Sequence, residues 1–289
     1  MRYLIIGANG QLGSDLVCVF QGEDLVALTH QEIEIRDIAS IRGALRQYSP
    51  DLVINTAAYH KVDLCEDRAD EAFAVNALGV RNVAMVCREQ DCALMHFSTD
   101  YVFDGRKGEP YVEEDLPGPL NAYGVSKLAG ECFVRAMLDR YFLLRTSGLF
   151  GTAGSSGKGG NFIETMLRLA SEGKAIRVVA DQVLSPTYTL DLARQIEVLV
   201  SGDNYGLYHA TSHGACSWYQ FAAKIFELEG IAPELSPQTT AESGSRAVRP
   251  AYSELDNQRL RTLGLDRMRS WEEGLADYLV ARRATRGDG

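Results

Sequence analysis

The sequence predicts an α/β protein with a Rossmann-type, doubly wound parallel sheet and a smaller C-terminal substrate lobe. Three observations predict this fold class. Short apolar runs alternate with helical patterns over the first half of the chain, as in the βαβ units that build a parallel sheet. A glycine-rich turn follows the first apolar run, and after residue 160 the alternation becomes less regular.

The elements of the first half follow from the spacing of apolar residues. These recur every three or four positions in helices and form short continuous runs in buried strands. Pro50 ends the second helix before the third strand begins. We expect strands at residues 2–6, 25–28, 52–55, 93–97 and 142–145, and helices at 11–20, 38–48, 66–90 and 123–138.

The second half predicts a smaller lobe. Five glycines between residues 151 and 160 predict a mobile connection before it. We expect a Rossmann domain at residues 1–147, to which elements at about 189–210 return, and a substrate-binding lobe at 148–188 and 211–289. The expected helices lie at 162–172, 190–200, 218–228 and 271–282, and the expected strands at 175–179 and 207–210.

Composition excludes several classes of function. The chain has 289 residues, 46% hydrophobic and 24% charged, which is enough to bury a large core without disulfides. Its formal charge of −10 argues against a nucleic-acid partner, and no run of about 18 apolar residues predicts a membrane span. The six cysteines show no C-x-x-C or metal-binding spacing. We expect a cytoplasmic protein with reduced thiols.

The glycine turn reads Gly-Ala-Asn-Gly-Gln-Leu-Gly and lies between the first expected strand and helix. Gly7 allows the tight turn, Gly10 lets the backbone approach a pyrophosphate, and Gly13 allows close packing of helix and strand. The helix N-terminus adds free N–H groups and a positive dipole end. The turn predicts that the Rossmann domain binds NAD(P) through Gly7, Asn9, Gly10, Gln11, Leu12 and Gly13.

The end of the second strand bears on the choice between NADPH and NADH. NAD-binding proteins usually have Asp or Glu about 20 residues after the glycines, where it holds the ribose 2′-hydroxyl. Here Leu28 is followed by Thr29, His30 and Gln31, with Glu32 close behind. Thr29 and His30 could accommodate a 2′-phosphate, so the sequence favours NADPH and leaves dual use open.

Tyr123 and Lys127 lie four residues apart on an expected helix, so their side chains share one face. Thr99 ends an expected strand, at the sheet edge where ligands of open α/β sheets bind. A tyrosine hydroxyl ordinarily has a pKa of about 10, and a cation one turn away lowers that pKa. We therefore expect proton transfer by Tyr123, with Thr99 holding a substrate oxygen.

With these residues the chain resembles an extended short-chain dehydrogenase/reductase and, within that group, the dTDP-4-dehydrorhamnose reductase family. The resemblance covers most of the chain, and Ser-Thr-Asp-Tyr-Val-Phe-Asp-Gly at residues 98–105 is one of its motifs. Besides the glycine turn, the other motifs lie at residues 55–58, 62–63, 75–82, 119–124, 127–131, 145–147, 161–162 and 186–187.

The resemblance implies reduction of the C4 ketone of a dTDP-linked 6-deoxysugar by NADPH or NADH. It implies that Thr99, Tyr123 and Lys127 form the catalytic triad, and that Tyr123 and Lys127 also contact the cofactor. Further cofactor contacts are implied at Asp37, Ile38, Ala57, Ala58, Tyr59 and Asn76. Contacts with the nucleotide sugar are implied at Val62, Thr99, Tyr101, Asn161 and Arg249.

Two departures from the family pattern matter. Gly148 stands where the family usually has tryptophan, so one aromatic wall of the sugar pocket is expected to be missing. On this interpretation Gly148→Trp would keep or improve activity on dTDP-4-dehydrorhamnose. Some members dimerise through a magnesium site of acidic side chains; Asp15 fits, but Leu190 replaces a second carboxylate. We expect no metal, and a homodimer remains open.

Three functions remain open at this point. The leading one is a reductase that makes dTDP-L-rhamnose or a related 6-deoxysugar. The second, suggested by Gly148, is a reductase of a different nucleotide-linked keto sugar. The third is a non-catalytic regulatory subunit like the related methionine adenosyltransferase beta subunit. The intact Thr99, Tyr123 and Lys127 argue against the third function, because a binding module need not keep them.

Overall fold

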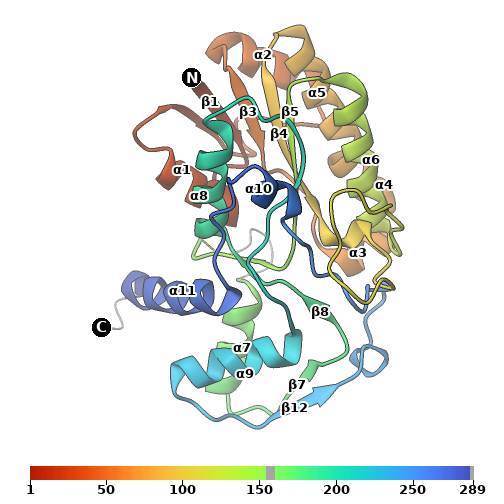
Figure 1. Cartoon of the computed structure of the whole chain (residues 1–289), viewed down its shortest axis with the longest axis vertical. Helices are drawn as coiled ribbons and strands as arrows, with labels where there is room; N and C mark the ends of the chain where they lie inside the picture. Colours follow the sequence, from red (N-terminus) through yellow and green to blue (C-terminus); the bar gives the residue numbers. More distant parts are fainter. Residues whose placement is uncertain (154–159, 287–289) are drawn as a thin grey trace.

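The computed structural model describes residues 1–153 and 160–286, and its centre is a parallel sheet of six strands (Figure 1). The strands are β1 (Arg2–Ile6), β2 (Asp24–Leu28), β3 (Leu52–Asn55), β4 (Ala93–Thr99), β5 (Tyr141–Thr146) and β10 (Gly206–His209). Their order across the sheet is β2-β1-β3-β4-β5-β10, and all neighbours pair in parallel. The expected Rossmann-type fold class is confirmed.

The strand order defines where a ligand can bind. After β2 the chain crosses β1 and continues on the other side with β3. Open α/β sheets bind ligands outside the carboxyl ends of their strands, at the point where the winding reverses. The glycine turn follows β1 and residues 56–59 follow β3, so both lie at this edge.

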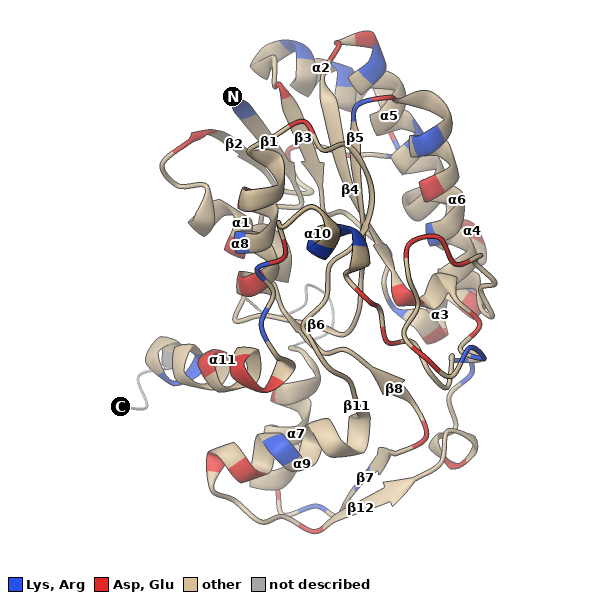
Figure 2. Cartoon of the chain, viewed as in Figure 1, with Lys and Arg blue, Asp and Glu red and all other residues tan. Residues whose placement is uncertain are grey.

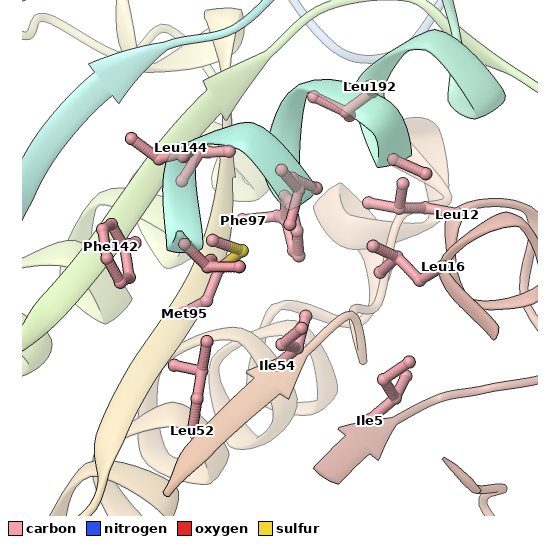
Figure 3. Packing of buried hydrophobic residues seen from close by; sticks show 14 of the residues in the cluster. Ile5, Leu12, Leu16, Leu52, Ile54, Met95, Phe97, Phe142, Leu144 and Leu192 are labelled. Carbon is pink, nitrogen blue, oxygen red and sulfur yellow. The ribbon is translucent and has the colours of Figure 1, made fainter. Parts of the chain in front are cut away.

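Helices cover both faces of the sheet and bury alternate strand residues (Figure 1). Ile5, Ile54 and Met95 point to one face, where they form a core with Leu12 and Leu192 (Figure 3). The helices of this face are α1 (Gln11–Val19), α8 (Thr189–Val200) and α10 (Gln258–Thr262). The opposite face carries α2 (Ile38–Tyr48), α5 (Val80–Glu89) and α6 (Ala122–Met137). In Figure 2 the sheet strands are mostly uncharged.

The second lobe has its own hydrophobic core and lies below the sheet in Figure 1. Its core contains stacked Phe150 and Tyr188, whose ring centroids lie 5.6 Å apart. Its larger elements are α7 (Phe162–Ser171), β7 (Ile176–Val179), α9 (Trp218–Glu229), β12 (Leu235–Gln238) and α11 (Trp271–Arg286). Short strands connect it: β6 (Leu149–Phe150), β8 (Val183–Leu184), β9 (Thr187–Tyr188) and β11 (Cys216–Ser217).

The helix expected at residues 66–90 is divided in the structure. Arg68 leaves helical geometry, with φ −130° and ψ 49°, between α3 (Val62–Asp67) and α4 (Ala69–Phe73). A π-helical turn at Ala74–Gly79 then joins α4 to α5. Such turns often occur at functional sites, and this one carries Asn76.

Two other expectations concern the glycine-rich connection and membrane-spanning helices. The predicted mobile connection at 151–160 falls largely on residues 154–159, which lie outside the described residues. Among the described residues, no helix combines the length and apolar composition needed to cross a bilayer.

Candidate active site

The glycine turn leaves a cradle that side chains would fill. Gly7 has φ +84°, and a Cβ there would lie 2.5 Å from Thr56 Oγ1. A Cβ on Gly13 would lie 2.1 Å from the Gly7 carbonyl oxygen. Gly10 is the N-cap of α1, and no side chain caps this helix end. The free N–H groups there fit a pyrophosphate.

The other turn residues differ in their surroundings. Asn9 is exposed, whereas Leu12 is buried in the core beneath the turn. Gln11 Oε1 accepts a hydrogen bond from the Gly151 N–H at 3.0 Å. Because the Leu12 side chain is buried, a phosphate at this helix end could contact Leu12 only through its backbone N–H.

Glu32 folds back onto the end of β2. Its Oε2 accepts hydrogen bonds from the backbone N–H and the hydroxyl of Thr29, each at 2.8 Å, and these bonds lower the pKa of Glu32. A carboxylate thus stands at the strand end, beside exposed His30. Asp37 caps α2 by accepting from the Ala39 N–H at 2.9 Å. The predicted adenine contacts of Asp37 and its neighbour Ile38 stay predictions.

Asn76 holds the loop that follows β3. Its Oδ1 accepts from the Tyr59 N–H at 2.8 Å, and its Nδ2 donates to the Tyr59 carbonyl oxygen at 2.9 Å. The same Nδ2 donates to Ser126 Oγ on α6 at 3.0 Å. The loop with Ala57, Ala58 and Tyr59 is therefore attached to the helix that carries Tyr123 and Lys127.

Thr99 ends β4, and Tyr123 and Lys127 lie one turn apart on α6, as expected. Asn121 Oδ1 caps this helix by accepting from the Gly124 N–H at 2.8 Å. Lys127 is 2% exposed, and its Nζ donates to the Phe97 carbonyl oxygen at 2.5 Å. Burial lowers the pKa of Lys127 to about 8.

Burial raises the pKa of Tyr123, and the Thr99 side chain opposes this rise. The net shift is therefore upward, because burial of the phenol outweighs the effect of Thr99, and a lowering of this pKa by Lys127 stays a prediction. A neutral phenol is the form that can donate a proton. The Tyr123 ring meets Tyr101 edge to face, with centroids 5.9 Å apart.

Residues 245–249, here called the strap, bring Arg249 to Tyr101. The Arg249 guanidinium donates to Tyr101 Oη at 3.3 Å and to Asp63 Oδ2 at 2.9 Å. Asp63 Oδ1 also accepts from Ser245 Oγ at 3.0 Å. Asp63 adjoins Val62 at the start of α3. The structure therefore brings Arg249 to Tyr101, which contacts Tyr123, and places Val62 one residue from the carboxylate that holds Arg249.

Asn161 is placed differently. Its Oδ1 caps α7 by accepting from the Glu164 N–H at 3.1 Å. Its Nδ2 donates to the Gly151 carbonyl oxygen at 3.1 Å and to Tyr278 Oη at 3.0 Å. These contacts support the lobe, and contact of Asn161 with a nucleotide sugar stays a prediction.

Comparison with known proteins decides the family. The family model described as RmlD substrate binding domain matches residues 1–283. The chain belongs to this family. The resemblance noted in the sequence is confirmed.

Relatives of the RmlD family match almost the whole chain. The spore coat polysaccharide biosynthesis protein SpsK of Bacillus subtilis is 40% identical, covering 97% of this chain and 98% of the relative. A dTDP-4-keto-6-deoxy-D-glucose reductase of Streptomyces niveus is 38% identical, covering 95% of both. A solved structure of dTDP-4-dehydrorhamnose reductase from Bacillus anthracis, in complex with NADP, is 41% identical with TM-score 0.92, covering 97% of this chain and 99% of that chain.

Gly148, where the resemblance implies a tryptophan, has a left-handed backbone conformation. Its φ is +54°, and a Cβ there would lie 2.8 Å from Leu184 Cδ1 and 3.1 Å from Pro186 Cα. A tryptophan would therefore clash and strain the backbone. The expectation that Gly148→Trp simply restores a pocket wall is wrong, because the space beside Gly148 holds Leu184 and Pro186.

Asp15, expected at the metal site of some family members, accepts from Thr189 Oγ1 at 2.5 Å. Within residues 1–153 and 160–286, no group of three or more His, Cys, Asp or Glu side chains is placed to hold a metal. Sequence reasoning missed the contacts of two other carboxylates. Asp63 anchors the strap, and Asp100 accepts hydrogen bonds from three hydroxyl groups. Both carboxylates lie inside motifs that carry the family resemblance, and this was the only sign in the sequence that they take part in the site.

Proposed function

We propose that this chain reduces the C4 ketone of dTDP-4-dehydrorhamnose to give dTDP-L-rhamnose. It is an NAD(P)H-dependent oxidoreductase of the RmlD family. The observation that carries the proposal is the arrangement of Thr99, Tyr123 and Lys127 at the carboxyl edge of the sheet, beside the glycine cradle. Loss of the proton donor would slow the reaction about 100-fold, so the arrangement can be tested directly.

A reduced nicotinamide supplies the hydride in this chemistry. Tyr123 holds the proton that the ketone oxygen must receive, and its raised pKa keeps that proton on the phenol before reaction. As negative charge develops on the phenol oxygen, the Lys127 ammonium one turn away stabilises it. Thr99 lies beside Tyr123, where its side chain contacts the phenol that donates the proton.

Recognition of the nucleotide sugar is assigned to Val62, Tyr101 and Arg249. Arg249 offers a planar cation of the kind that binds phosphates bidentately, and the strap holds it next to Tyr101. We also propose that residues 1–147, with the elements at about 189–210, form the cofactor-binding domain and that the lobe at 148–188 and 211–289 takes part in binding the sugar nucleotide. Association into a homodimer and a cytoplasmic location stay predictions, the first of which sedimentation of the purified chain would test.

The test measures NADPH oxidation by the purified chain with a panel of dTDP- and UDP-linked 4-keto sugars, and identifies products by mass spectrometry. We expect dTDP-L-rhamnose from dTDP-4-dehydrorhamnose, formed about 100-fold more slowly by Tyr123→Phe. Wild-type protein that oxidises no NADPH with any sugar of the panel would overturn the proposal.

A second candidate is a reductase of another dTDP-linked 4-keto sugar. It is favoured by the name of the Streptomyces niveus relative, a dTDP-4-keto-6-deoxy-D-glucose reductase. The same panel separates the two functions, because the second requires a larger kcat/KM for a sugar other than dTDP-4-dehydrorhamnose.

A further inference from the structure

Asp100 is a buried carboxylate beside the triad that the mechanism above does not use. It is 3% exposed and directly follows Thr99. Thr99 Oγ1 donates to its Oδ1 at 3.0 Å. Ser147 Oγ and Ser253 Oγ donate to its Oδ2 at 2.9 and 2.6 Å. Three hydroxyl donors fit an ionised carboxylate, which can only accept.

These bonds fix the Thr99 hydroxyl. A hydroxyl has one proton, and in this structure the proton of Thr99 is directed to Asp100. The Tyr101 N–H donates to the same oxygen at 3.2 Å. The Thr99 side chain is therefore held from two sides before any substrate binds, in contact with Tyr123.

Asp100 Oδ2 also joins the sheet to the segment that leads into the second lobe and to a segment within that lobe. Ser147 directly precedes Gly148, where the chain leaves β5. Ser253 belongs to a segment paired with β8: its N–H donates to the Val183 carbonyl oxygen at 2.8 Å, and the Val183 N–H donates to the Ala251 carbonyl oxygen at 2.9 Å. One carboxylate thus connects the Thr99 hydroxyl to both segments.

We propose that Asp100 is a positioning residue for the reduction, because its carboxylate orients the Thr99 hydroxyl and ties that orientation to the seating of the substrate lobe. The proposal rests on the proposed reductase function. It requires Asp100 to act through Thr99, which a purely structural role does not require.

The test is a double-mutant cycle of Asp100→Asn and Thr99→Ala. Asp100→Asn keeps one acceptor oxygen and replaces the other by an NH2 group, which only donates, so the three hydroxyls can no longer all donate to residue 100. We expect kcat to fall about tenfold, because small displacements of reacting groups are costly, while the Kd for NADPH changes less than about twofold. In the Thr99→Ala background, Asp100→Asn should change kcat less than about twofold. Equal loss in both backgrounds would overturn the proposal.

A matched control is Glu113→Gln. Glu113 is also a buried carboxylate, 7% exposed, which accepts from the N–H groups of His209 and Arg259 at 2.9 and 3.2 Å. This variant should lower the melting temperature and leave kcat unchanged. If Asp100→Asn does not fold, Ser147→Ala combined with Ser253→Ala replaces it and should lower kcat in the same direction, with no further effect in the Thr99→Ala background.

Crystal structures give a readout that does not depend on turnover. In Asp100→Asn we expect Thr99 Oγ1 in a different rotamer from the wild type, with Tyr123 unmoved. Wild-type protein that reduces no sugar would contradict the proposed function, and the Thr99 rotamer would still decide the role of Asp100. An unchanged Thr99 rotamer in a variant whose amide NH2 group faces Thr99 contradicts the positioning role.

Discussion

The guanidinium of Arg249 and the carboxylate of Asp63 form an ion pair at 2.9 Å, which joins two segments that are 186 residues apart in the chain. The pair is one of several contacts between the strap and α3. Asp63 Oδ1 accepts from the Arg246 and Ala247 N–H groups at 3.2 and 3.1 Å. A single carboxylate therefore holds the segment that presents Arg249 beside Tyr101.

Asp63→Asn should raise the KM for the nucleotide sugar. The substitution removes the ion pair and leaves one acceptor oxygen instead of two for the hydrogen bonds of the strap. Arg249 is therefore held less firmly. Because the pair is partly exposed, we expect a rise of about fivefold, with kcat and the Kd for NADPH little changed. Arg246→Ala is the control, since its ion pair with Asp67 lies on the surface. Equal KM values for Asp63→Asn and the wild type would exclude this role.

Tyr123→Phe should lower kcat by about 100-fold, the usual scale for a lost proton donor. The phenyl ring keeps the packing against Tyr101, so the Kd for NADPH and the melting temperature should stay close to those of the wild type. Stopped assays of NADPH oxidation and a fluorescence titration of NADPH measure the two quantities. Near wild-type turnover would show that another group supplies the proton. Tyr48→Phe, on α2, is the control.

Lys127 predicts a pH dependence near neutrality. Its pKa is lowered to about 8 by burial, so the ammonium loses its proton as the pH rises through that value. NADPH affinity should therefore fall as the pH rises from about one unit below to about one unit above 8. Lys127→Met should abolish this pH dependence. A titration of NADPH at each pH measures it, and an affinity that is flat across the window in the wild type would contradict it.

The same shift predicts how stability changes with pH. The unfolded chain keeps the lysine proton up to the ordinary pKa of about 10.4, whereas the folded chain releases it near 8. Between these values the unfolded state binds more protons, so the free energy of unfolding contributed by Lys127 rises with pH. Wild-type stability should therefore improve relative to Lys127→Met as the pH increases through this window.

The parallel sheet was predictable because its apolar runs are local features of the sequence, whereas the contacts around the site were not. The division of the helix expected at 66–90 depends on Arg68, whose non-helical backbone no propensity indicates. Two-residue strands such as β6 leave too short a pattern to detect. Asp100 has partners 47 and 153 residues away, so only folding identifies them.

The candidate site divides in the same way. The spacing of Tyr123 and Lys127 predicts a shared helix face, which is local geometry. Two other features of the site depend on how α6 packs on β4. Burial raises the pKa of Tyr123, and the Lys127 ammonium contacts the Phe97 carbonyl oxygen. Glu32 lies only three residues after Thr29, but the sequence alone did not indicate that its carboxylate folds back to accept hydrogen bonds from Thr29.

Glu32→Gln should increase the preference for NADPH. Glu32 places a negative charge at the end of β2, near the expected position of the ribose 2′-phosphate. Glu32 is exposed, so solvent and salt weaken its repulsion of a phosphate, and the KM for NADPH should fall only about twofold while that for NADH stays the same. Glu23→Gln, at the opposite end of β2, is the control. In the wild type, a tenfold preference for NADH would contradict the favoured use of NADPH.

Gly148→Ala should destabilise the fold more than an ordinary glycine substitution in the same conformation. Gly173 provides the comparison, because its φ is +65° and a Cβ there would meet nothing within 4 Å. Gly173→Ala therefore measures backbone strain alone, about 1 kcal/mol. Gly148→Ala adds the contact with Leu184 Cδ1, and we expect a loss of about 2–3 kcal/mol in the free energy of unfolding.

Leu184→Ala separates the two causes at Gly148. If the methyl group of Leu184 is responsible for the extra loss, Gly148→Ala should cost about 1 kcal/mol in the Leu184→Ala background, as at Gly173. Denaturant unfolding of the four proteins measures the coupling. Equal costs of Gly148→Ala with and without Leu184 would place the penalty in the backbone at Pro186 Cα, which lies 3.1 Å from the added Cβ and cannot be trimmed. In either case tryptophan at this position would cost more than alanine, because its indole must also displace Leu184 from a site where it is 4% exposed.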